Sequence, residues 1–424
     1  MMKKILIISM FCMALGASAV VKPGVEVLRD GGFKELQGKR VGLVTNPSGI
    51  DNNLKSTVDI LNEAPGVRLV ALFGPEHGVR GNAHAGDAVG NDVDAKTGIR
   101  VYSLFGKTHQ PTAEMLRGID VLVYDIQDVG CRSYTFCSTL GVCMEACAKH
   151  DVEFMVLDRP NPLGGNKVEG CLVEKGYESF VSKYPVPYVY GLTPGEFARY
   201  LNEEGLNAHK ARLTVIPMQG WTRDMTFRQT GMPWVLPSPQ IPTPESAFFY
   251  PLSGIIGELY VFNTGIGYTL PFQLFCATWA DADRVADAMN ALHLPGLNFR
   301  PINVKPFFVT SVDVNQEKKE VHGVQTYITD YDQANLTLTQ FYFLQVMHEL
   351  YPQQPIFEQN TKRYNMFDKV CGTSEIRERF CRNYKVADMA DYWNKDAEHF
   401  KAVSSKYYLY DNSPVQAGSR RTAH

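Results

Sequence analysis

The sequence lacks the short motifs of several common site types. It has no Cys-x-x-Cys pair, no HExxH or GxSxG sequence, and neither a GxGxxG nor a Walker loop. The first two motifs mark many zinc sites, GxSxG marks many serine hydrolases, and the last two mark many nucleotide sites. We therefore predict a protein that needs no cofactor and contains no metal site.

Charge of one sign and long apolar runs are scarce as well. The formal net charge is −3, and the basic residues are scattered apart from pairs at Lys3–Lys4 and Arg420–Arg421. This balance argues against nucleic acid or an anionic membrane surface as a main partner. The 424 residues, 45% of them hydrophobic, are enough for about two or three domains with ordinary cores.

The first residues resemble an export signal. The sequence "MMKK" is a short basic region, "ILIISMFCMALG" is an apolar core, and "ASA" at 17–19 is a small-x-small cleavage site. The apolar core is too short to cross a bilayer comfortably. Met10 and Phe11 are too large for a lipid-attachment site at Cys12. We expect cleavage after Ala19 and an exported, soluble protein, periplasmic if the cell has two membranes.

Nine cysteines are present, and Cys12 lies in the leader, so eight remain after cleavage. The spacing of Cys143 and Cys147 on an expected helix favours small packing residues over a metal site or disulfides, and we extend this interpretation to Cys131 and Cys137. Cys371 and Cys381 form the disulfide pair that we consider first.

Apolar, β-rich runs alternate with helical patterns between residue 40 and about residue 220. Near-continuous apolar strands that alternate with helices are typical of a mostly parallel sheet covered on both faces, which places the chain in the α/β class. Thr193 and Glu196 form a capping box before one of the helices. The expected strands are 40–46, 67–74, 99–106, 121–128, 153–160 and 213–220.

The composition changes after this series. Residues 231–251 contain six prolines and little periodicity, so they are expected to cross the molecule and line a surface or cleft. A smaller α+β domain should follow, with strands near 307–314 and 321–330 and helices over 284–292 and 337–351. The predicted organisation is therefore a signal peptide at 1–19, a catalytic domain at 20–245 and a smaller domain at 246–424.

Polar residues follow four of the expected strands. In a parallel sheet the carboxyl ends of the strands meet at one edge, where ligands bind. We expect a site there. Its candidate residues are Asn46 after the first strand, Glu76 and His77 after the second, Asp125, Gln127 and Asp128 at the fourth, and Arg159 and Asn161 at the fifth.

Glu76 and His77 lie between Gly74, Pro75 and Gly78 in the sequence "LFGPEHG". A carboxyl group partly removed from water keeps its proton nearer to neutral pH and can act as a general acid. A loop carboxylate that only accepts backbone hydrogen bonds fits the pattern equally well. His77 is a second acid–base group, an orienting residue, a metal ligand or a structural histidine.

The sequence "DIQDVGCRSYTF", 125–136, is the densest polar cluster. Arg132 is suited to gripping a substrate carboxylate, or else it neutralises Asp125 or Asp128. Tyr134 is a candidate binding residue. Arg159 extends the cluster from the next strand end. An internal network of salt bridges that only holds the turn is the structural alternative.

Six ordered motifs resemble those of the NamZ-type exo-β-N-acetylmuramidase family, long known only as a domain of unknown function. They are "GLVTNPSGID", "LFGPEHGVRG", "VYSLFG", "DVLVYDIQDVGCRSYTF", "VLDRPNPLGG" and "PSPQIPT". The resemblance covers residues from about 38 to about 360. It implies a Rossmann-like domain, a smaller C-terminal domain and a cleft between them. It also implies release of terminal N-acetylmuramic acid from peptidoglycan fragments, with Glu76 as the catalytic glutamate.

The sequence also departs from the common pattern of that family. Val189 and Tyr190 stand where many relatives have Arg-His, Gln240 stands in "SPQIPT" where "SPNMPT" is usual, and Ile266 occupies an arginine position. Glu258 is retained. These changes fall on segments expected to line the cleft, so they point to a paralogue with a different preference among peptidoglycan fragments.

Glycoside hydrolysis needs an acid for the leaving oxygen and a second group for water or the anomeric carbon. We assign the acid to Glu76 and keep three carboxylates open for the second group: Asp125, Asp128 and Glu258. Arg132 or Arg159 would bind the lactyl carboxylate. Two other functions compete: an exported sugar- or muropeptide-binding protein without turnover, and a metal-dependent hydrolase that uses His77, His84 and the aspartates.

Overall fold

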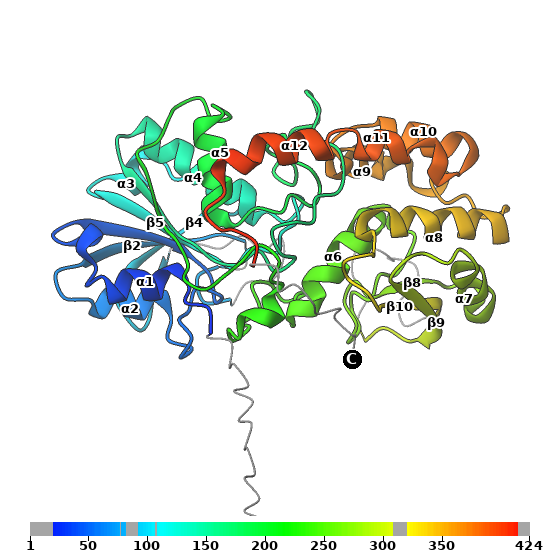
Figure 1. Cartoon of the computed structure of the whole chain (residues 1–424), viewed down its shortest axis with the longest axis horizontal. Helices are drawn as coiled ribbons and strands as arrows, with labels where there is room; N and C mark the ends of the chain where they lie inside the picture. Colours follow the sequence, from blue (N-terminus) through cyan, green and yellow to red (C-terminus); the bar gives the residue numbers. More distant parts are fainter. Residues whose placement is uncertain (1–19, 77, 82–91, 107, 308–319, 414–424) are drawn as a thin grey trace, which may run out of the picture.

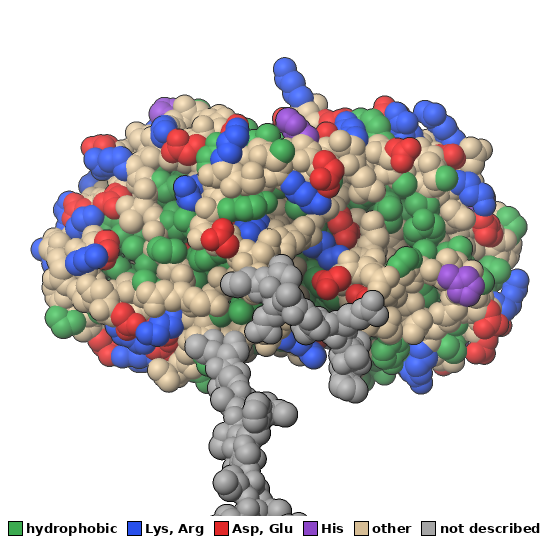
Figure 2. Space-filling view, in the orientation of Figure 1, with side chains coloured by type: hydrophobic (Ala, Val, Ile, Leu, Met, Phe, Trp, Pro, Cys, Tyr) green, Lys and Arg blue, Asp and Glu red, His purple; other side chains and the backbone are tan. Residues whose placement is uncertain are grey.

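The structure, a computed structural model, describes residues 20–76, 78–81, 92–106, 108–307 and 320–413. Two lobes lie side by side and are joined by a helix that runs between them (Figure 1). Among the described residues, no helix is both long and apolar enough to cross a membrane. Figure 2 shows acidic and basic side chains interspersed over one face, as the scattered charges of the sequence predict.

The N-terminal lobe contains a seven-stranded sheet in the order β3-β4-β2-β1-β5-β6-β7. Six strands are parallel, and the two-residue β3 pairs antiparallel with β4 at one edge. The predicted parallel sheet is thus confirmed, with each predicted strand at its expected place. The strands are β1 (Arg40–Thr45), β2 (Arg68–Gly74), β3 (Asp92–Val93), β4 (Arg100–Ser103), β5 (Val121–Asp125), β6 (Glu153–Leu157) and β7 (Leu213–Ile216).

Helices cover both faces of this sheet. Alternate residues of β5 point to opposite sides: Val123 packs with helices α1 and α2, whereas Tyr124 packs with α3, α4 and α5. Burial on both faces explains why the strands are apolar throughout. The capping box of Thr193 and Glu196 forms as predicted. The helices are α1 (Gly24–Asp30), α2 (Thr57–Glu63), α3 (Ala113–Leu116), α4 (Phe136–Lys149) and α5 (Pro194–Glu203), with short 3-10 turns η1 (Lys34–Leu36) and η2 (Phe227–Thr230).

The C-terminal lobe contains a three-stranded antiparallel sheet in the order β8-β10-β9 and a set of helices. Its core is the largest apolar cluster of the described chain, and α6 and α8 pack together at its centre. Its elements are α6 (Pro244–Gly257), β8 (Leu274–Ala277), α7 (Ala282–Ala291), β9 (Leu297–Val304), β10 (Val321–Ile328), α8 (Leu336–Leu350), η4 (Glu358–Arg363), α9 (Tyr364–Cys371), α10 (Glu375–Asn383), η5 (Val386–Asp388), α11 (Ala390–Asn394), α12 (Ala397–Ser404) and η6 (Ser405–Tyr407).

Several features differ from the sequence prediction. Helix α6 begins inside the segment that we expected to be irregular, because Pro244 is favourable in a first helical turn and Pro251 is tolerated within the helix. The strand expected near 307–314 lies almost entirely outside the described residues, and β9 precedes it. The helices from α9 to α12 had no prediction.

Of the two predictions about the cysteines, one is confirmed and one is wrong. Cys137, Cys143 and Cys147 are buried in one apolar cluster between α4 and the sheet, which confirms their packing role. The disulfide predicted between Cys371 and Cys381 is wrong, because both carry free thiols. Cys371 instead packs in the core of the C-terminal lobe, where it needs no cross-link.

The chain returns to the N-terminal lobe at its end. Helix α12 lies beside α5 (Figure 1), and Phe400 packs into the apolar cluster of the N-terminal lobe. Residues 405–413 continue along that lobe, and we call them the C-terminal strap. The predicted boundary between 245 and 246 therefore separates the sheets, while the last described residues lie against the first lobe.

Candidate active site

The edge formed by the carboxyl ends of the parallel strands contains a topological switch point. From β1 the chain proceeds outward to β2 and β4, and it then returns to β5 on the other side of β1. Thr45 and Asp125 are paired across that point. In open α/β sheets, ligands bind outside the carboxyl ends of the strands at such a place.

Glu76 lies beside the switch point, two residues after the end of β2. It is partly exposed. The hydroxyl of Thr135 donates a hydrogen bond of 2.9 Å to its Oε2. The turn that presents it depends on glycine: a Cβ on Gly74 would approach the Gly78 backbone to 3.1 Å, and Gly78 has a φ of 76°. His77 lies outside the described residues.

Tyr134 connects the loop after β5 to the C-terminal lobe. Its ring lies 5.1 Å from that of Tyr250 on α6, and its hydroxyl is hydrogen-bonded to Ser238. Burial, together with the negative charges of Glu76 and Asp128, raises the pKa of the Tyr134 phenol. The phenol therefore stays protonated near neutral pH, close to both carboxyl groups.

Asp128 is the buried carboxyl of this region. Its Oδ1 accepts the backbone N–H groups of Val129 at 2.6 Å and Gly130 at 3.2 Å. Burial raises the pKa of Asp128 to about 6, although these bonds and one to the Tyr190 hydroxyl favour the charged form. Gly130 is required here, because a Cβ would lie 2.3 Å from Oδ1 of Asn161.

Asn46 and Gln127 organise the loops around the switch point. Asn46 donates to the carbonyl of Pro237 at 3.0 Å and accepts from Ser48. Gln127 donates to the carbonyl of Pro160 at 2.7 Å, while its buried Oε1 has no partner among the described residues. The Asn46 bond fastens the 231–243 segment to the end of β1, and the Gln127 bond ties the loop after β5 to the loop after β6. Gln240 lies in the 231–243 segment and is partly buried.

Asp125 and Arg159 form an internal ion pair. Nε of Arg159 lies 2.5 Å from Oδ1 of Asp125, and both side chains are buried. Arg159 also donates to the carbonyl of Ile50, and Thr57 donates to Asp125. The structure thus shows Asp125 and Arg159 in the internal salt-bridge network that the sequence offered as an alternative to substrate binding.

Arg132 is buried and joins the two lobes. Its guanidinium donates to four backbone carbonyls, not to Asp125 or Asp128 as one interpretation of the sequence expected. The acceptors are the carbonyls of Cys171 at 2.7 Å, Val186 at 2.6 Å, Val370 at 3.0 Å and Cys371 at 2.8 Å. Val370 and Cys371 lie at the end of α9 in the C-terminal lobe, where carbonyls lack helical partners.

The remaining predicted residues also have structural partners. Asn161 donates to the carbonyl of Leu192 at 3.0 Å. Glu258 follows the last residue of α6 and pairs with Arg363, and burial raises its pKa. Sequence reasoning missed Thr135, which contacts Glu76, and also Ser238 and Tyr250, which contact Tyr134. Thr135 stands next to Tyr134 in the cluster "SYTF", which was the one available signal for it.

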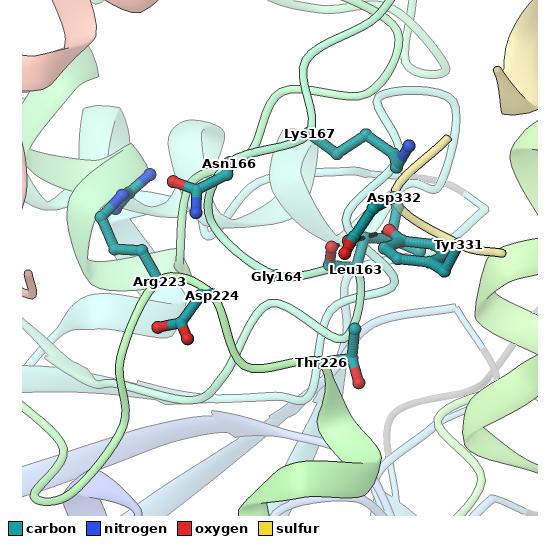
Figure 3. A pocket seen from close by; sticks show the side chains of 9 residues that line it. All are labelled: Leu163, Gly164, Asn166, Lys167, Arg223, Asp224, Thr226, Tyr331 and Asp332. Atoms are coloured by element: carbon teal, nitrogen blue, oxygen red, sulfur yellow. Dashed lines mark hydrogen bonds between the residues drawn. The ribbon is translucent and has the colours of Figure 1, made fainter. Parts of the chain in front are cut away.

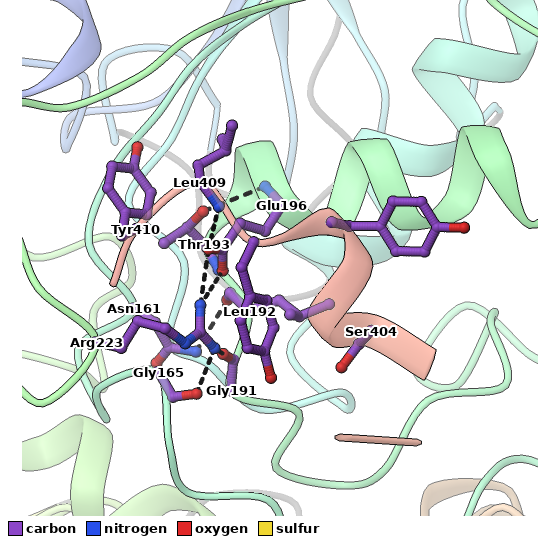
Figure 4. Close-up of polar contacts among 12 residues, drawn as sticks. Asn161, Gly165, Gly191, Leu192, Thr193, Glu196, Arg223, Ser404, Leu409 and Tyr410 are labelled. Carbon is purple, nitrogen blue, oxygen red and sulfur yellow. Dashed lines mark hydrogen bonds and ion pairs between the residues drawn. The ribbon is translucent and has the colours of Figure 1, made fainter. Parts of the chain in front are cut away.

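The β6 side of the same edge is closed by the chain itself (Figure 4). Asp158 accepts hydrogen bonds from Thr193 at 2.8 Å and from Tyr410 of the C-terminal strap at 2.6 Å. Arg223 pairs with buried Glu196 at 2.7 Å, and the backbone N–H of Leu409 donates to the same carboxylate. These carboxyl groups face protein donors.

A polar cavity of about 450 Å³ lies near Arg223, between the lobes (Figure 3). It contains none of the predicted site residues. Across the described part of the chain, His, Cys, Asp and Glu form no group of three or more that could hold a metal ion. The cavity is lined by Leu163, Gly164, Asn166, Lys167, Arg223, Asp224, Thr226, Tyr331 and Asp332.

Comparisons with known proteins agree over nearly the whole chain. The N-terminal model of the family described as exo-β-N-acetylmuramidase NamZ matches residues 41–245, and the C-terminal model matches residues 248–410. The peptidoglycan β-N-acetylmuramidase NamZ of Bacillus subtilis (strain 168) is 43% identical over 390 residues, covering 92% of this chain and 91% of that protein.

Two solved structures are also similar, both crystal structures of DUF1343 family proteins from Bacteroides fragilis NCTC 9343. The first is 54% identical with a TM-score of 0.88, and the match covers 92% of this chain and 99% of that one. The second is 29% identical with a TM-score of 0.72, and the match covers 93% and 100%, respectively.

Proposed function

The chain belongs to the NamZ family of exo-β-N-acetylmuramidases and is a glycosidase, and from this premise we propose that it releases terminal N-acetylmuramic acid from the non-reducing end of peptidoglycan fragments, with Glu76 as the general acid. One observation carries the assignment of Glu76. It is a partly exposed carboxyl at the switch-point edge of the sheet, and its described partner is a neutral hydroxyl.

In this mechanism Glu76 gives its proton to the glycosidic oxygen while the bond from that oxygen to C1 breaks. The electron pair of the broken bond stays with the oxygen, so the remainder of the fragment leaves as an alcohol. Water then supplies the new oxygen on C1. The proton that this water loses goes to a second carboxylate.

We assign the second carboxylate to Asp128. Asp125 is neutralised by buried Arg159, and Glu258 pairs with Arg363. Asp128 faces no cation within hydrogen-bonding distance among the described residues, and burial raises its pKa to about 6. A carboxyl that titrates near the working pH is suited to accepting and releasing protons.

The test is cleavage of two substrates: a chromogenic β-N-acetylmuramide and a disaccharide with muramic acid at its non-reducing end. Release of free N-acetylmuramic acid from both, identified by mass, is the expected result. A folded protein that cleaves neither substrate contradicts the proposal. Saturable binding of the disaccharide without turnover would instead identify a binding protein.

We also propose that the protein is exported, because residues 1–19 have the three regions of a cleavable signal. Peptidoglycan fragments arise outside the cytoplasm, where an exported glycosidase would meet them. N-terminal sequencing of the mature protein should begin at Val20, and cell fractionation should recover it outside the cytoplasm. An intact Met1 on the active protein would contradict export.

A further inference from the structure

Thr135 is the residue that contacts the proposed acid. Its Oγ1 lies 2.9 Å from Oε2 of Glu76, and it is the hydrogen-bond partner of Glu76 among the described residues. The backbone of Thr135 is fixed as well, because its carbonyl accepts the backbone N–H of Thr139 at 2.9 Å in the first turn of α4. A nearly buried hydroxyl on a fixed backbone has little freedom to turn away.

We propose that Thr135 is the positioning residue of the general acid, and that its hydroxyl makes Oε2 of Glu76 an acceptor so that the transferable proton resides on Oε1. The proposal rests on the proposed role of Glu76.

The chemistry of a carboxyl group supports this assignment of atoms. A protonated carboxyl has one O–H and one oxygen that only accepts hydrogen bonds. A hydroxyl that donates to Oε2 therefore favours the proton on Oε1 and fixes the direction in which that proton points. During the reaction the Oε1 proton passes to the glycosidic oxygen, and Glu76 becomes a carboxylate.

The same contact stabilises the product of that step. A hydrogen bond from a neutral donor to a carboxylate is stronger than one to a neutral acid. Thr135 is also the N-cap residue of the 14-residue helix α4, whose amino-terminal end favours negative charge. The donor and the helix both support the charge that develops on Glu76 as it loses its proton.

Two titratable groups from neighbouring segments share this environment. The negative charges of Glu76 and Asp128 both raise the pKa of the Tyr134 phenol, in addition to the effect of burial. Burial keeps Tyr134 protonated near neutral pH, and the pKa of Asp128 of about 6 places its titration on the acid side of the activity profile.

The test compares three variants of the full-length protein: Thr135→Val, Thr135→Ser and Thr139→Val. Thr135→Val keeps the shape and removes the donor, and Thr135→Ser keeps the donor. Thr139→Val is the matched control, since it removes a buried hydroxyl one turn further along α4. That hydroxyl bonds to the Thr135 carbonyl, and the carbonyl keeps its bond to the backbone N–H of Thr139 in the variant.

For Thr135→Val we expect kcat on the chromogenic muramide to fall about tenfold to a hundredfold with KM within about twofold. Thr135→Ser and Thr139→Val should both retain activity within about threefold of wild type.

Several results would overturn the proposal. A Thr135→Val variant as active as wild type would overturn it, and so would a Thr135→Ser variant as impaired as Thr135→Val. If Thr139→Val loses as much activity, Thr135 only holds the helix. An active wild type with an unaffected Thr135→Val removes this inference alone, whereas a wild type inactive on both substrates removes the proposed function and this inference with it.

Discussion

The two halves of one sheet edge use similar polar residues in opposite ways. On the β6 side, Asp158 and Glu196 are buried and bonded to Tyr410 and Arg223 within the protein. On the β2 side, Glu76 is partly exposed, and its described partner is one hydroxyl. The chain fills one half with its own C-terminal strap, whereas Glu76 in the other half keeps part of its surface exposed.

The difference teaches that a polar strand end is an opportunity for a site, and that the available partners decide its use. A buried carboxylate with a cation and several donors is stable but has little freedom to exchange protons. A partly exposed carboxyl with one neutral donor remains able to transfer a proton. Asp125 follows the first pattern even though it lies at the switch point.

The largest expected effect is the loss of activity in Glu76→Gln. Removing the general acid should lower kcat by about a hundredfold to ten-thousandfold, with the free energy of unfolding unchanged. The measurement is kcat on the chromogenic muramide together with denaturant unfolding. Glu63→Gln, an exposed carboxylate on α2, is the matched control. Full activity in Glu76→Gln would mean that the carboxyl groups on the β2 side of the sheet edge are no more catalytic than those on the β6 side.

Arg159→Met should act on stability. It leaves the carboxylate of Asp125 buried and unpaired, which costs about 3–5 kcal/mol in comparable buried pairs. Urea unfolding measures the loss, and the double variant Asp125→Leu, Arg159→Met should regain most of it. If Arg159→Met instead raises KM for the muramide and leaves stability intact, Arg159 serves the substrate and belongs with Glu76.

The free energy of unfolding should depend on pH through Asp128. An unfolded aspartate loses its proton near pH 4, whereas the folded pKa is about 6, so the folded state holds an extra proton between these values. This contribution to stability falls by about 3 kcal/mol as pH rises from about 4 to about 6. Asp128→Asn should lack that fall in a series of unfolding curves.

Asp120→Asn is the control with the opposite sign. The hydrogen bond from Arg40 lowers the pKa of Asp120 to about 2, so its effect on stability lies between about pH 2 and pH 4. Between pH 4 and pH 6 its curve should run parallel to that of wild type. A parallel curve for Asp128→Asn would show that Asp128 is ionised throughout.

The smallest effects should come from the C-terminal strap. Tyr410→Phe removes a donor to buried Asp158 and an acceptor for the N–H of Met218, at a cost of about 1–3 kcal/mol. Tyr407→Phe removes a surface bond to Glu204 and should cost less than about 1 kcal/mol. Thermal unfolding of both variants gives the comparison. Equal losses would mean that burial does not distinguish the two contacts.

Much of the fold was predictable because its signals are local. Apolar runs such as residues 121–125 predict strands buried on both faces, and the capping box at Thr193 predicts the start of α5. Helix α6 was missed because its prolines are typical of loops, and its apolar packing depends on α8, far along the chain. The disulfide prediction was wrong because cysteine spacing carries no information on whether two sulfurs meet.

The sequence by itself determined that polar residues gather at one sheet edge, since strand direction in a parallel sheet follows from the order of strands and helices. It also placed Glu76 there. The tertiary structure decided which protein groups bond to those residues. Asp158 accepts a hydrogen bond from Tyr410, 252 positions away, and Glu76 accepts one from Thr135, 59 positions away. Hydrogen bonds and ion pairs depend on atoms within a few ångströms, and only the folded chain brings such distant residues together.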